Sequence, residues 1–224
     1  MLAAVFLNSV FEFCRPMDYI SKAFMIYCAA MPSQLDKILL TGQPGCGKTT
    51  AVMKIIDNLA WHGHPGRERA GSPYHMKIAG FYTQEIRRNN VRKGFSWKRL
   101  DGAVGTLAHV DIKERFKVGK YGVDVDGFDK NVVPVLDVEQ TAADLFVIDE
   151  IGKMECFSKK FVTAVRRLFE SDKPVLTTVA KKGTGLISEI KNYPNIQLFN
   201  LTAANREKIV AEILERLSFL RRTL

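Results

Sequence analysis

The chain has 224 residues, of which 46% are hydrophobic and 25% charged, close to the average of soluble globular proteins. This length suits one large domain, or one domain with an appendage, and the composition argues against a disordered, collagen-like or coiled-coil chain. The net charge of +9 fits binding of nucleic acid, binding of small polyphosphates, or simply a basic surface. No uncharged apolar run of ~18 residues occurs, so no transmembrane helix is expected.

The four cysteines carry no zinc or redox motif. Cys14, Cys28, Cys46 and Cys156 form no CxxC pair and no Cys/His cluster with the spacing of a zinc site. They are interpreted as free thiols of a reducing compartment, which predicts a cytoplasmic location. The sequence does not specify an oligomeric state, and a monomer is the default expectation.

Residues 1–30 differ in composition from the rest of the chain. They are rich in Phe, Met, Ala and Cys, and their four charges cancel. A secretory signal would have a basic start and an unbroken apolar stretch, and neither is found here. Residues 1–30 are therefore interpreted as an N-terminal extension of a domain that spans 31–224 and starts at Met31. The sharper alternative is a surface helix or a weak membrane anchor.

Short apolar runs alternate with segments of helical period from residue 38 onward. In chain order, the patterns predict a strand at 38–41, a helix at 47–60, a loop at 63–72, a strand at 78–82, a β-hairpin of 94–100 and 104–110, a strand at 145–149, a helix at 155–170, strands at 175–179 and 196–201, and a last helix capped by Thr202. This alternation predicts an α/β fold with a mostly parallel central sheet and an inserted β-hairpin.

The strongest motif is Gly42-Gln43-Pro44-Gly45-Cys46-Gly47-Lys48-Thr49, which fits G-x-x-x-x-G-K-[ST] between a predicted strand and a predicted helix. In this phosphate loop (residues 42–49), glycines let backbone N–H groups turn inward around a phosphate, and the following helix, with Thr50, presents unpaired N–H groups to the same anion. Lys48 suits the β- and γ-phosphates and is a catalytic candidate, whereas the Thr49 hydroxyl is expected to bind Mg²⁺. The alternative, a glycine turn that opens a helix, explains neither Lys48 nor Thr49.

A second motif is the apolar strand at 145–149, which ends in two acids. In open α/β sheets, ligands bind at the carboxyl ends of the strands. Asp149 is therefore expected to serve Mg²⁺, and Glu150 is a catalytic candidate that orients or deprotonates a water molecule. Both residues, with Gly152, are assigned to the nucleotide site. A simpler role for Asp149, capping of the next helix, is compatible with this assignment.

The segment Asp149-Glu150-Ile151-Gly152-Lys153-Met154-Glu155, together with the phosphate loop, resembles the signature of the small P-loop nucleoside-triphosphatases, called cancer-related in vertebrates and thermostable in archaea and bacteria. The resemblance covers about residues 36–217, with further matches at 80–85, 94–95, 118–121 and 205–206. It implies a three-layer P-loop NTPase fold and Mg²⁺-dependent hydrolysis of ribonucleoside triphosphates, ATP and GTP among them, with loose base preference. Residues 1–30 have no counterpart in the family, and the loop at 63–77 is longer than usual.

Two other functions stay open. One is a nucleoside or nucleotide kinase that transfers the γ-phosphate on the same scaffold, and the other is a nucleotide-gated nucleic-acid-binding protein. Glu150 beside Asp149 favours water as the acceptor, and an arginine-rich kinase lid is not found. A guanine-specific switch is disfavoured, because the Asn-Lys-x-Asp segment that reads guanine is absent from the sequence.

Basic residues surround Phe95 and Trp97 on the predicted hairpin: Arg87, Arg88, Arg92, Lys93, Lys98 and Arg99. Such a cluster is compatible with stacking of nucleic-acid bases, with binding of one triphosphate, or with a solvated strand edge. The family resemblance favours the triphosphate over nucleic acid. Lys181 and Lys182 are interpreted as part of an ordinary basic loop, with stabilisation of transition-state charge as the sharper alternative.

A chain that begins at Met31 is expected to fold and to hydrolyse nucleoside triphosphates as fast as the full chain, because every motif lies downstream of Met31. Circular dichroism and phosphate release from ATP, measured side by side on both chains, check this expectation. Insolubility or inactivity of the shortened chain alone would show that residues 1–30 belong to the domain.

Overall fold

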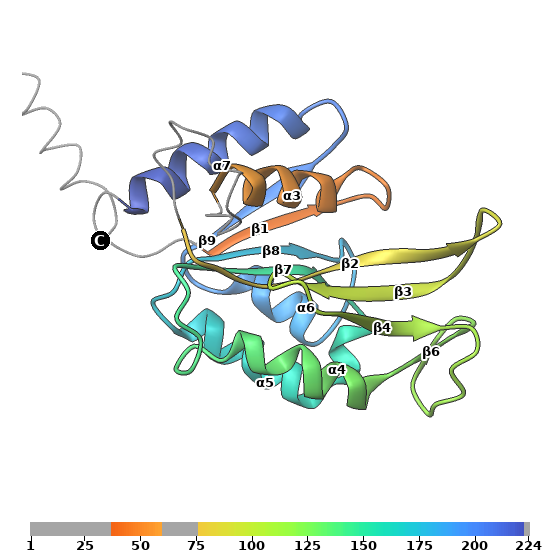
Figure 1. The fold of residues 1–224 in the computed structure, drawn as a ribbon. Coiled ribbons are helices and arrows are strands. Elements are labelled where there is room, and N and C mark those ends of the chain that lie inside the picture. Colours follow the sequence, from red (N-terminus) through yellow and green to blue (C-terminus); the bar gives the residue numbers. More distant parts are fainter. Residues whose placement is uncertain (1–36, 60–75, 222–224) are drawn as a thin grey trace, which may run out of the picture. The chain divides into compact units, whose positions relative to one another are not determined.

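The computed structural model describes residues 37–59 and 76–221, which form a layered α/β arrangement (Figure 1). Its strands are β1 (Lys37–Gly42), β2 (Ile78–Arg88), β3 (Val91–Arg99), β4 (Val104–His109), β5 (Lys117–Val118), β6 (Tyr121–Val123), β7 (Leu145–Ile151), β8 (Val175–Val179) and β9 (Ile196–Leu201). Its helices are α3 (Lys48–Leu59), α4 (Val125–Asn131), α5 (Lys159–Glu170), α6 (Leu186–Glu189) and α7 (Arg206–Arg221), with the 3-10 turns η1 (Val133–Leu136), η2 (Glu155–Phe157) and η3 (Ile190–Asn192). The expected loop at 63–72 and residues 1–36 lie outside the described residues.

The nine strands of the described residues form one sheet in the order β5-β6-β4-β3-β2-β7-β8-β1-β9. The strands β2, β7, β8, β1 and β9 run parallel to one another. The strands β3, β4, β6 and β5 continue the sheet in antiparallel pairs. The expected parallel sheet is thus one half of a mixed sheet, and the expected hairpin, formed by β3 and β4, lies in the other half.

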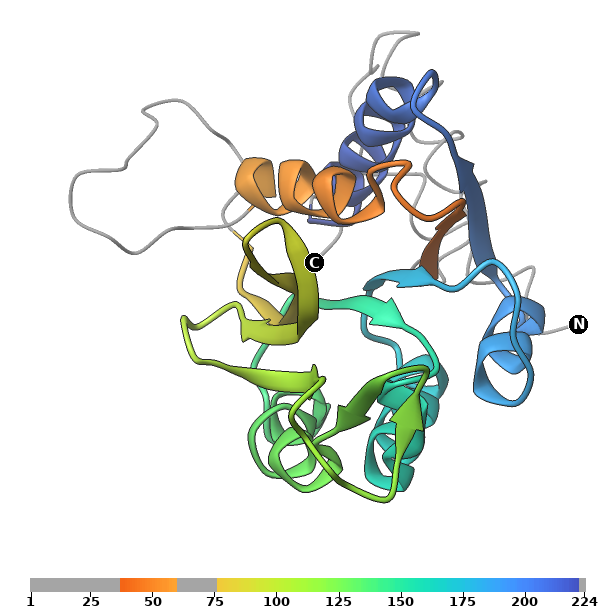
Figure 2. The ribbon, with the colours of Figure 1, turned by 90° about the vertical axis from the view of Figure 1, so that its right-hand side faces the viewer.

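Helices cover both faces of the sheet, which confirms the three-layer arrangement. The helices α3 and α7 lie on one face, and α4 and α5 lie on the other (Figures 1 and 2). In β7, Leu145 and Val147 pack with the first pair, whereas Phe146 and Ile148 pack with the second. A strand buried on both faces is an unbroken apolar run, which is why this strand was readable from the sequence. None of the described helices has the length and apolar character needed to cross a membrane.

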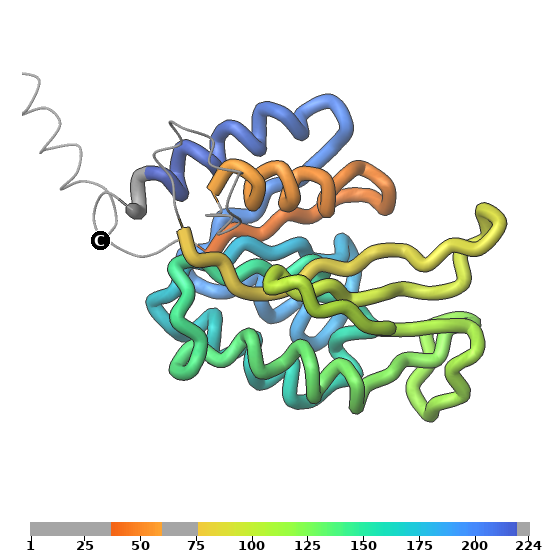
Figure 3. Tube along the Cα trace, in the orientation of Figure 1, coloured from red at the N-terminus to blue at the C-terminus, as the bar shows by residue number. Residues whose placement is uncertain are grey.

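The strand β2 is longer than the sequence suggested. It pairs with β7 up to Tyr82 and then continues with β3 alone to Arg88. Figure 3 shows this β2–β3 hairpin extending beyond the ends of β7 and β8. Asn89 and Asn90 form its turn with φ angles of 51° and 60°, a left-handed conformation that Asn tolerates better than most residues.

The helix expected at 155–170 is divided into η2 and α5. Ser158 separates the two, because its backbone is extended and its side-chain oxygen accepts a hydrogen bond from the Phe161 N–H at 2.8 Å. This is an N-cap, which ends one helical segment and begins the next. Thr202, expected to cap the last helix, lies ahead of it, because α7 begins at Arg206. Its hydroxyl accepts a hydrogen bond from the Asn205 N–H at 3.2 Å and so closes the turn that precedes the helix.

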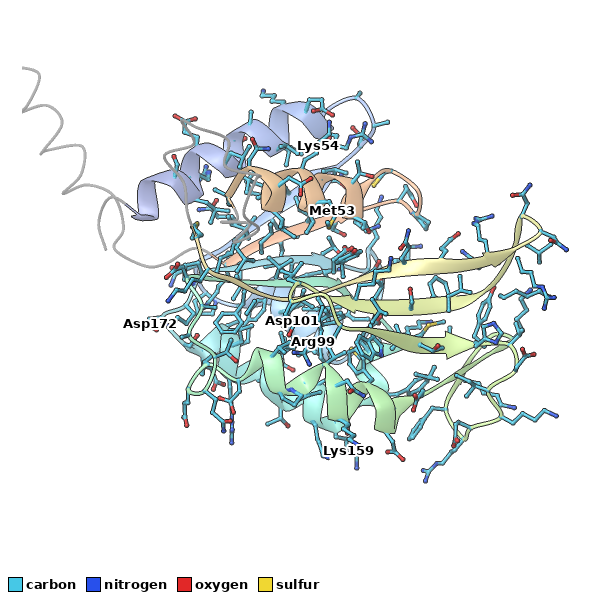
Figure 4. All side chains as sticks on the ribbon, viewed as in Figure 1. Met53, Lys54, Arg99, Asp101, Lys159 and Asp172 are labelled. Atoms are coloured by element: carbon cyan, nitrogen blue, oxygen red, sulfur yellow. The ribbon has the colours of Figure 1, made fainter. Side chains whose placement is uncertain are left out.

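Lys37 holds the end of the sheet opposite the phosphate loop to the C-terminus of α5. Its side chain is buried, and Nζ donates to the carbonyl oxygens of Leu168, Ser171 and Lys173 at 3.0, 2.9 and 2.5 Å. Burial lowers its pKa to about 8, although the charge of Asp172, labelled in Figure 4, acts in the opposite direction. The last carbonyls of a helix have no partners within the helix, so an ammonium group with three donors can satisfy them.

We expect Lys37→Met to lower the free energy of unfolding by about 2–4 kcal/mol, because three carbonyl groups would lose a buried donor. Urea denaturation measures the effect. Lys208→Met serves as the control, since Lys208 is exposed on α7, and should change stability by no more than about 0.5 kcal/mol. Equal stabilities of the two variants would show that the Lys37 contacts do not support the fold.

Candidate active site

The carboxyl ends of the parallel strands meet at one edge of the sheet. β1 leads into the phosphate loop, β7 carries Asp149 and Glu150 near its end, and β8 lies between these two strands. Figure 2 looks onto this edge, where the loop between β1 and α3 is drawn in orange. The register of the sheet therefore brings together two motifs that are about a hundred residues apart in the sequence.

Glycine is required in the phosphate loop for two different reasons. Gly45 and Gly47 have φ angles of 77° and 91°, which side chains with a Cβ rarely adopt. Gly42 has no such angle, but a Cβ at this position would lie 2.4 Å from the carbonyl oxygen of Leu201 on β9. The loop is thus seated directly against the end of the neighbouring strand. Gln43, Pro44 and Thr50 are exposed at its surface.

Cys46 points beneath the loop. A Cβ at Gly42 would lie 2.8 Å from its Sγ atom, and its side chain packs against the apolar cluster beside α3 and α7. The thiol thus faces into the protein rather than outward. The backbone of Cys46 remains part of the loop, with its N–H donating to the Gln43 carbonyl oxygen at 3.3 Å.

Lys48 begins α3 and folds back over the loop. Its Nζ atom lies 3.4 Å and 3.5 Å from the carbonyl oxygens of Gly42 and Gln43. Its positive charge also lowers the pKa values of Asp149 and Glu150, against the effect of their burial. Lys48 is therefore the cation that acts on both acids of the second motif.

Asp149 is a buried carboxylate with one free oxygen. Only 1% of the residue is exposed, and its Oδ1 accepts a hydrogen bond from the Thr178 hydroxyl on β8 at 2.5 Å. Its Oδ2 has no hydrogen-bond partner among the described residues. Burial raises the pKa of Asp149, whereas Thr178, the Thr49 hydroxyl and the charge of Lys48 favour its ionised form. A buried carboxylate oxygen beside a threonine hydroxyl fits Mg²⁺, which prefers oxygen ligands.

Two further acids lie beside Asp149. Burial raises the pKa of Glu150. The positive charge of Lys48 acts in the opposite direction, and the charge of Asp149 raises the pKa further. Glu155 is 5% exposed, and burial together with the charges of Glu150 and Asp149 raises its pKa to about 8, against hydrogen bonds from backbone N–H groups. One of these comes from Gly152, whose N–H donates to Glu155 Oε2 at 3.2 Å. The N–H of Gly152 is thus directed at Glu155.

Sequence reasoning missed Glu155 and Thr178 as members of this site. Glu155 lies within the quoted acidic motif, but it was interpreted as the first residue of a helix. Thr178 is buried in an apolar strand, where a threonine is easily mistaken for a β-branched core residue. Its role depends on the pairing of β7 with β8, which no local pattern specifies.

The basic cluster of the β2–β3 hairpin is partly neutralised. Glu85 forms ion pairs with Arg87 at 2.6 Å and with Arg92 at 2.7 Å, and Arg99 pairs with Asp101. Figure 4 labels Arg99 and Asp101 beside the turn between β3 and β4. The guanidinium of Arg92 also lies over the rings of Phe95 and Tyr121. Three of the six cations therefore have an acidic partner close by, and the pair of Arg92 with Glu85 joins β3 to β2.

Lys181 and Lys182 are exposed in the loop after β8, at the same edge of the sheet as the phosphate loop. The carbonyl oxygen of Lys181 accepts a hydrogen bond from Lys191 Nζ at 3.0 Å. The backbone of this loop is thereby fixed, while the two lysine side chains have no ion-pair partner among the described residues.

Comparison with known proteins identifies the family. The model of the NTPase family matches residues 37–214. The chain belongs to this family of nucleoside-triphosphatases. It is 38% identical over 183 residues to the nucleoside-triphosphatase THEP1 of Thermotoga maritima, covering 82% of this chain and 96% of that protein. It is 34% identical over 189 residues to the human cancer-related nucleoside-triphosphatase, covering 79% and 93%.

The fold of this NTPase family member is also found in a solved structure. The crystal structure of THEP1 from Aquifex aeolicus matches with a TM-score of 0.67 and 32% sequence identity, over 81% of this chain and 98% of that chain. The expected P-loop NTPase fold and the resemblance noted from the acidic motif are therefore confirmed.

We expect Gly42→Ala to weaken nucleotide binding by at least ~10-fold, because the added Cβ would push the phosphate loop away from the Leu201 carbonyl oxygen. Calorimetric titration with ATP measures this change. Gly119→Ala is the control, since Gly119 lies in the turn between β5 and β6, has a φ of 58° and has open space around its Cβ position. This control should lose about 1–2 kcal/mol of stability and keep its ATP affinity. Unchanged affinity of Gly42→Ala would contradict the seating of the loop.

Proposed function

We propose that the chain hydrolyses ribonucleoside 5′-triphosphates, ATP and GTP among them, to the diphosphate and phosphate with the help of Mg²⁺ and with loose base preference. One observation carries the proposal. The phosphate loop and the buried acids of β7 lie at a single edge of the sheet, and the charge of Lys48 acts on both Asp149 and Glu150. The names of the relatives, which are nucleoside-triphosphatases, support the same reaction.

The phosphate loop binds the triphosphate. Its inward N–H groups and the N-terminus of α3 attract the negative phosphate oxygens, and Lys48 places its ammonium group on the β- and γ-phosphates. In the structure, the ammonium group lies over the loop, at the carbonyl groups of Gly42 and Gln43.

Thr49 and Asp149 would hold Mg²⁺, since the Oδ2 of Asp149 has no hydrogen-bond partner among the described residues. When bound there, Mg²⁺ would supply positive charge against the negative charge that develops on the phosphates during transfer. Thr178 fixes the orientation of the Asp149 carboxylate by holding its other oxygen.

Glu150 would handle the attacking water. Its carboxylate adjoins Asp149 but is half-buried, so water can reach it. Burial raises its pKa above the ordinary range of glutamate, and a carboxylate with a raised pKa is a stronger base. Glu150 therefore orients the water and accepts its proton as the γ-phosphate departs.

Nucleic-acid binding receives less support from the geometry. Three of the six hairpin cations are engaged in ion pairs within the β2–β4 region, so fewer charges face a polyanion than the sequence suggests. Hydrolysis and phosphoryl transfer are separated by a direct assay. Phosphate release from ATP and Mg²⁺ should be the same with and without added nucleosides or nucleotides, and a phosphorylated acceptor would instead indicate a kinase.

We expect Lys48→Ala to abolish nucleotide turnover and to weaken ATP binding, because no other cation within the phosphate loop reaches the phosphates. Phosphate release and calorimetric titration measure the two effects. Lys54→Ala is the matched control on the same helix, where Lys54 forms an exposed ion pair with Glu207 at 2.7 Å (Figure 4). Near-parental hydrolysis by folded Lys48→Ala would remove the assignment of the site.

Glu150→Gln should keep Mg-nucleotide binding and lose ~10²-fold or more in hydrolysis rate, the size of a general-base contribution. Asp149→Asn should instead raise the Mg²⁺ concentration needed for half-maximal activity. Initial rates over a Mg²⁺ series distinguish the two variants, and Glu170→Gln, an exposed change on α5, is the control. Parental turnover by Glu150→Gln would show that another group activates the water.

A further inference from the structure

Arg206, the first residue of α7, reaches back to the phosphate loop. A Cβ built at Gly47 would lie 2.5 Å from Nη1 of Arg206 and 3.2 Å from its Cδ atom. The side chain therefore covers the open side of Gly47, one residue before Lys48. This contact joins the last helix of the fold to the loop that binds the phosphates.

The guanidinium of Arg206 makes few polar contacts with the described part of the protein. Its Nε atom lies 3.4 Å from Glu207 Oε1, and this carboxylate is also paired with Lys54 at 2.7 Å. Its two Nη groups have no hydrogen-bond partner among the described residues. The side chain is 30% exposed, so one part rests on the loop and another part faces solvent.

The segment that leads to Arg206 is held rigidly. The Thr202 N–H donates to Asn205 Oδ1 at 2.7 Å, the Asn205 N–H donates to Thr202 Oγ1 at 3.2 Å, and Asn205 Nδ2 donates to the Asn200 carbonyl oxygen at 3.0 Å. Gly42 and Leu201 are paired in the sheet, which places this segment beside the loop. A rigid support of this kind suits a residue that positions a ligand.

The strand order determines which end of a nucleotide Arg206 would meet. Asp149 and Glu150 lie on β7, two strands from β1 on one side, whereas β9 and Arg206 lie on the other side of β1. A triphosphate on the loop whose γ-phosphate faces the two acids must extend its nucleoside toward β9. Arg206 is then the cation on the nucleoside side of the phosphate loop.

We propose that Arg206 stacks its guanidinium plane on the base of the bound nucleotide. This inference rests on the proposed function, because the γ-phosphate must face Glu150. A planar guanidinium stacks on the face of any base, since every base has a π-face, and such a contact does not read the base edges. Recognition by stacking gives affinity for the nucleoside with loose base preference.

The test compares ligands with and without a base. Full-length protein is titrated calorimetrically in EDTA, which prevents Mg²⁺-dependent turnover, with ATP, GTP and ribose 5′-triphosphate. Arg206→Ala should weaken ATP and GTP binding about five- to tenfold and change the affinity for ribose 5′-triphosphate less than twofold. Arg216→Ala is the control on the same helix, where Arg216 pairs with Glu212 at 3.1 Å, and should change neither affinity.

Arg206→Lys keeps the positive charge and most of the aliphatic side chain but loses the planar guanidinium. This variant is used if thermal melting shows that Arg206→Ala is unfolded. The loss of affinity in Arg206→Lys should also be confined to ATP and GTP, the ligands that carry a base. An equal loss for ribose 5′-triphosphate would assign Arg206 to the phosphates and overturn the proposal, as would unchanged ATP affinity in both variants. Failure of the wild-type protein to release phosphate in Mg²⁺ would contradict the hydrolase function separately, because these titrations do not depend on turnover.

Discussion

The pairing of β8 with both β1 and β7 is the constraint on which the site depends. It fixes the distance between the phosphate loop and the acids of β7, and it buries the carboxylate of Asp149 between strands. Thr178 on β8 holds this carboxylate directly. Without the intervening strand, the glycine loop would be an anion-binding turn and the acidic strand would be an ordinary sheet edge.

The site brings three acidic side chains together although burial disfavours their ionised forms. Asp149, Glu150 and Glu155 lie together, and burial raises the pKa of each. Lys48 offsets part of this cost for Asp149 and Glu150, whereas Glu155 is held by backbone N–H groups. A cluster of acids with raised pKa values beside an anion-binding loop is expected where a cation and a polyphosphate bind together, and it has no evident value for stability alone.

The parts of the fold that the sequence predicted are those with strong local patterns. The apolar run of β7, the glycine loop and the amphipathic face of α5 each follow from side chains close together in the chain. The short elements β5, β6, α4 and α6 were missed because a few residues carry too little periodicity to be recognised. The Asn89-Asn90 turn was readable, since two asparagines in succession favour the left-handed conformation of a hairpin, but it was overlooked.

The residues of the candidate site are likewise of two kinds, those that a local motif identifies and those that it does not. Lys48, Thr49 and Asp149 belong to motifs whose chemistry is visible in the sequence. Thr178 and Arg206 join the site only through contacts between distant segments, which are set by the pairing of β8 with β7 and of β9 with β1. Residues whose roles depend on tertiary register cannot be assigned from one sequence, even when the fold class is correct.

The proposed function requires a triphosphate to lie across this edge of the sheet in one direction, with its γ-phosphate toward β7 and its nucleoside toward β9. A crystal structure of the full chain with Mg²⁺ and a non-hydrolysable ATP analogue tests it most directly. We expect Lys48 Nζ on the β- and γ-phosphates, Mg²⁺ between Thr49 and Asp149, and the γ-phosphate next to Glu150. A triphosphate bound in the reverse direction, or away from the phosphate loop, would contradict it.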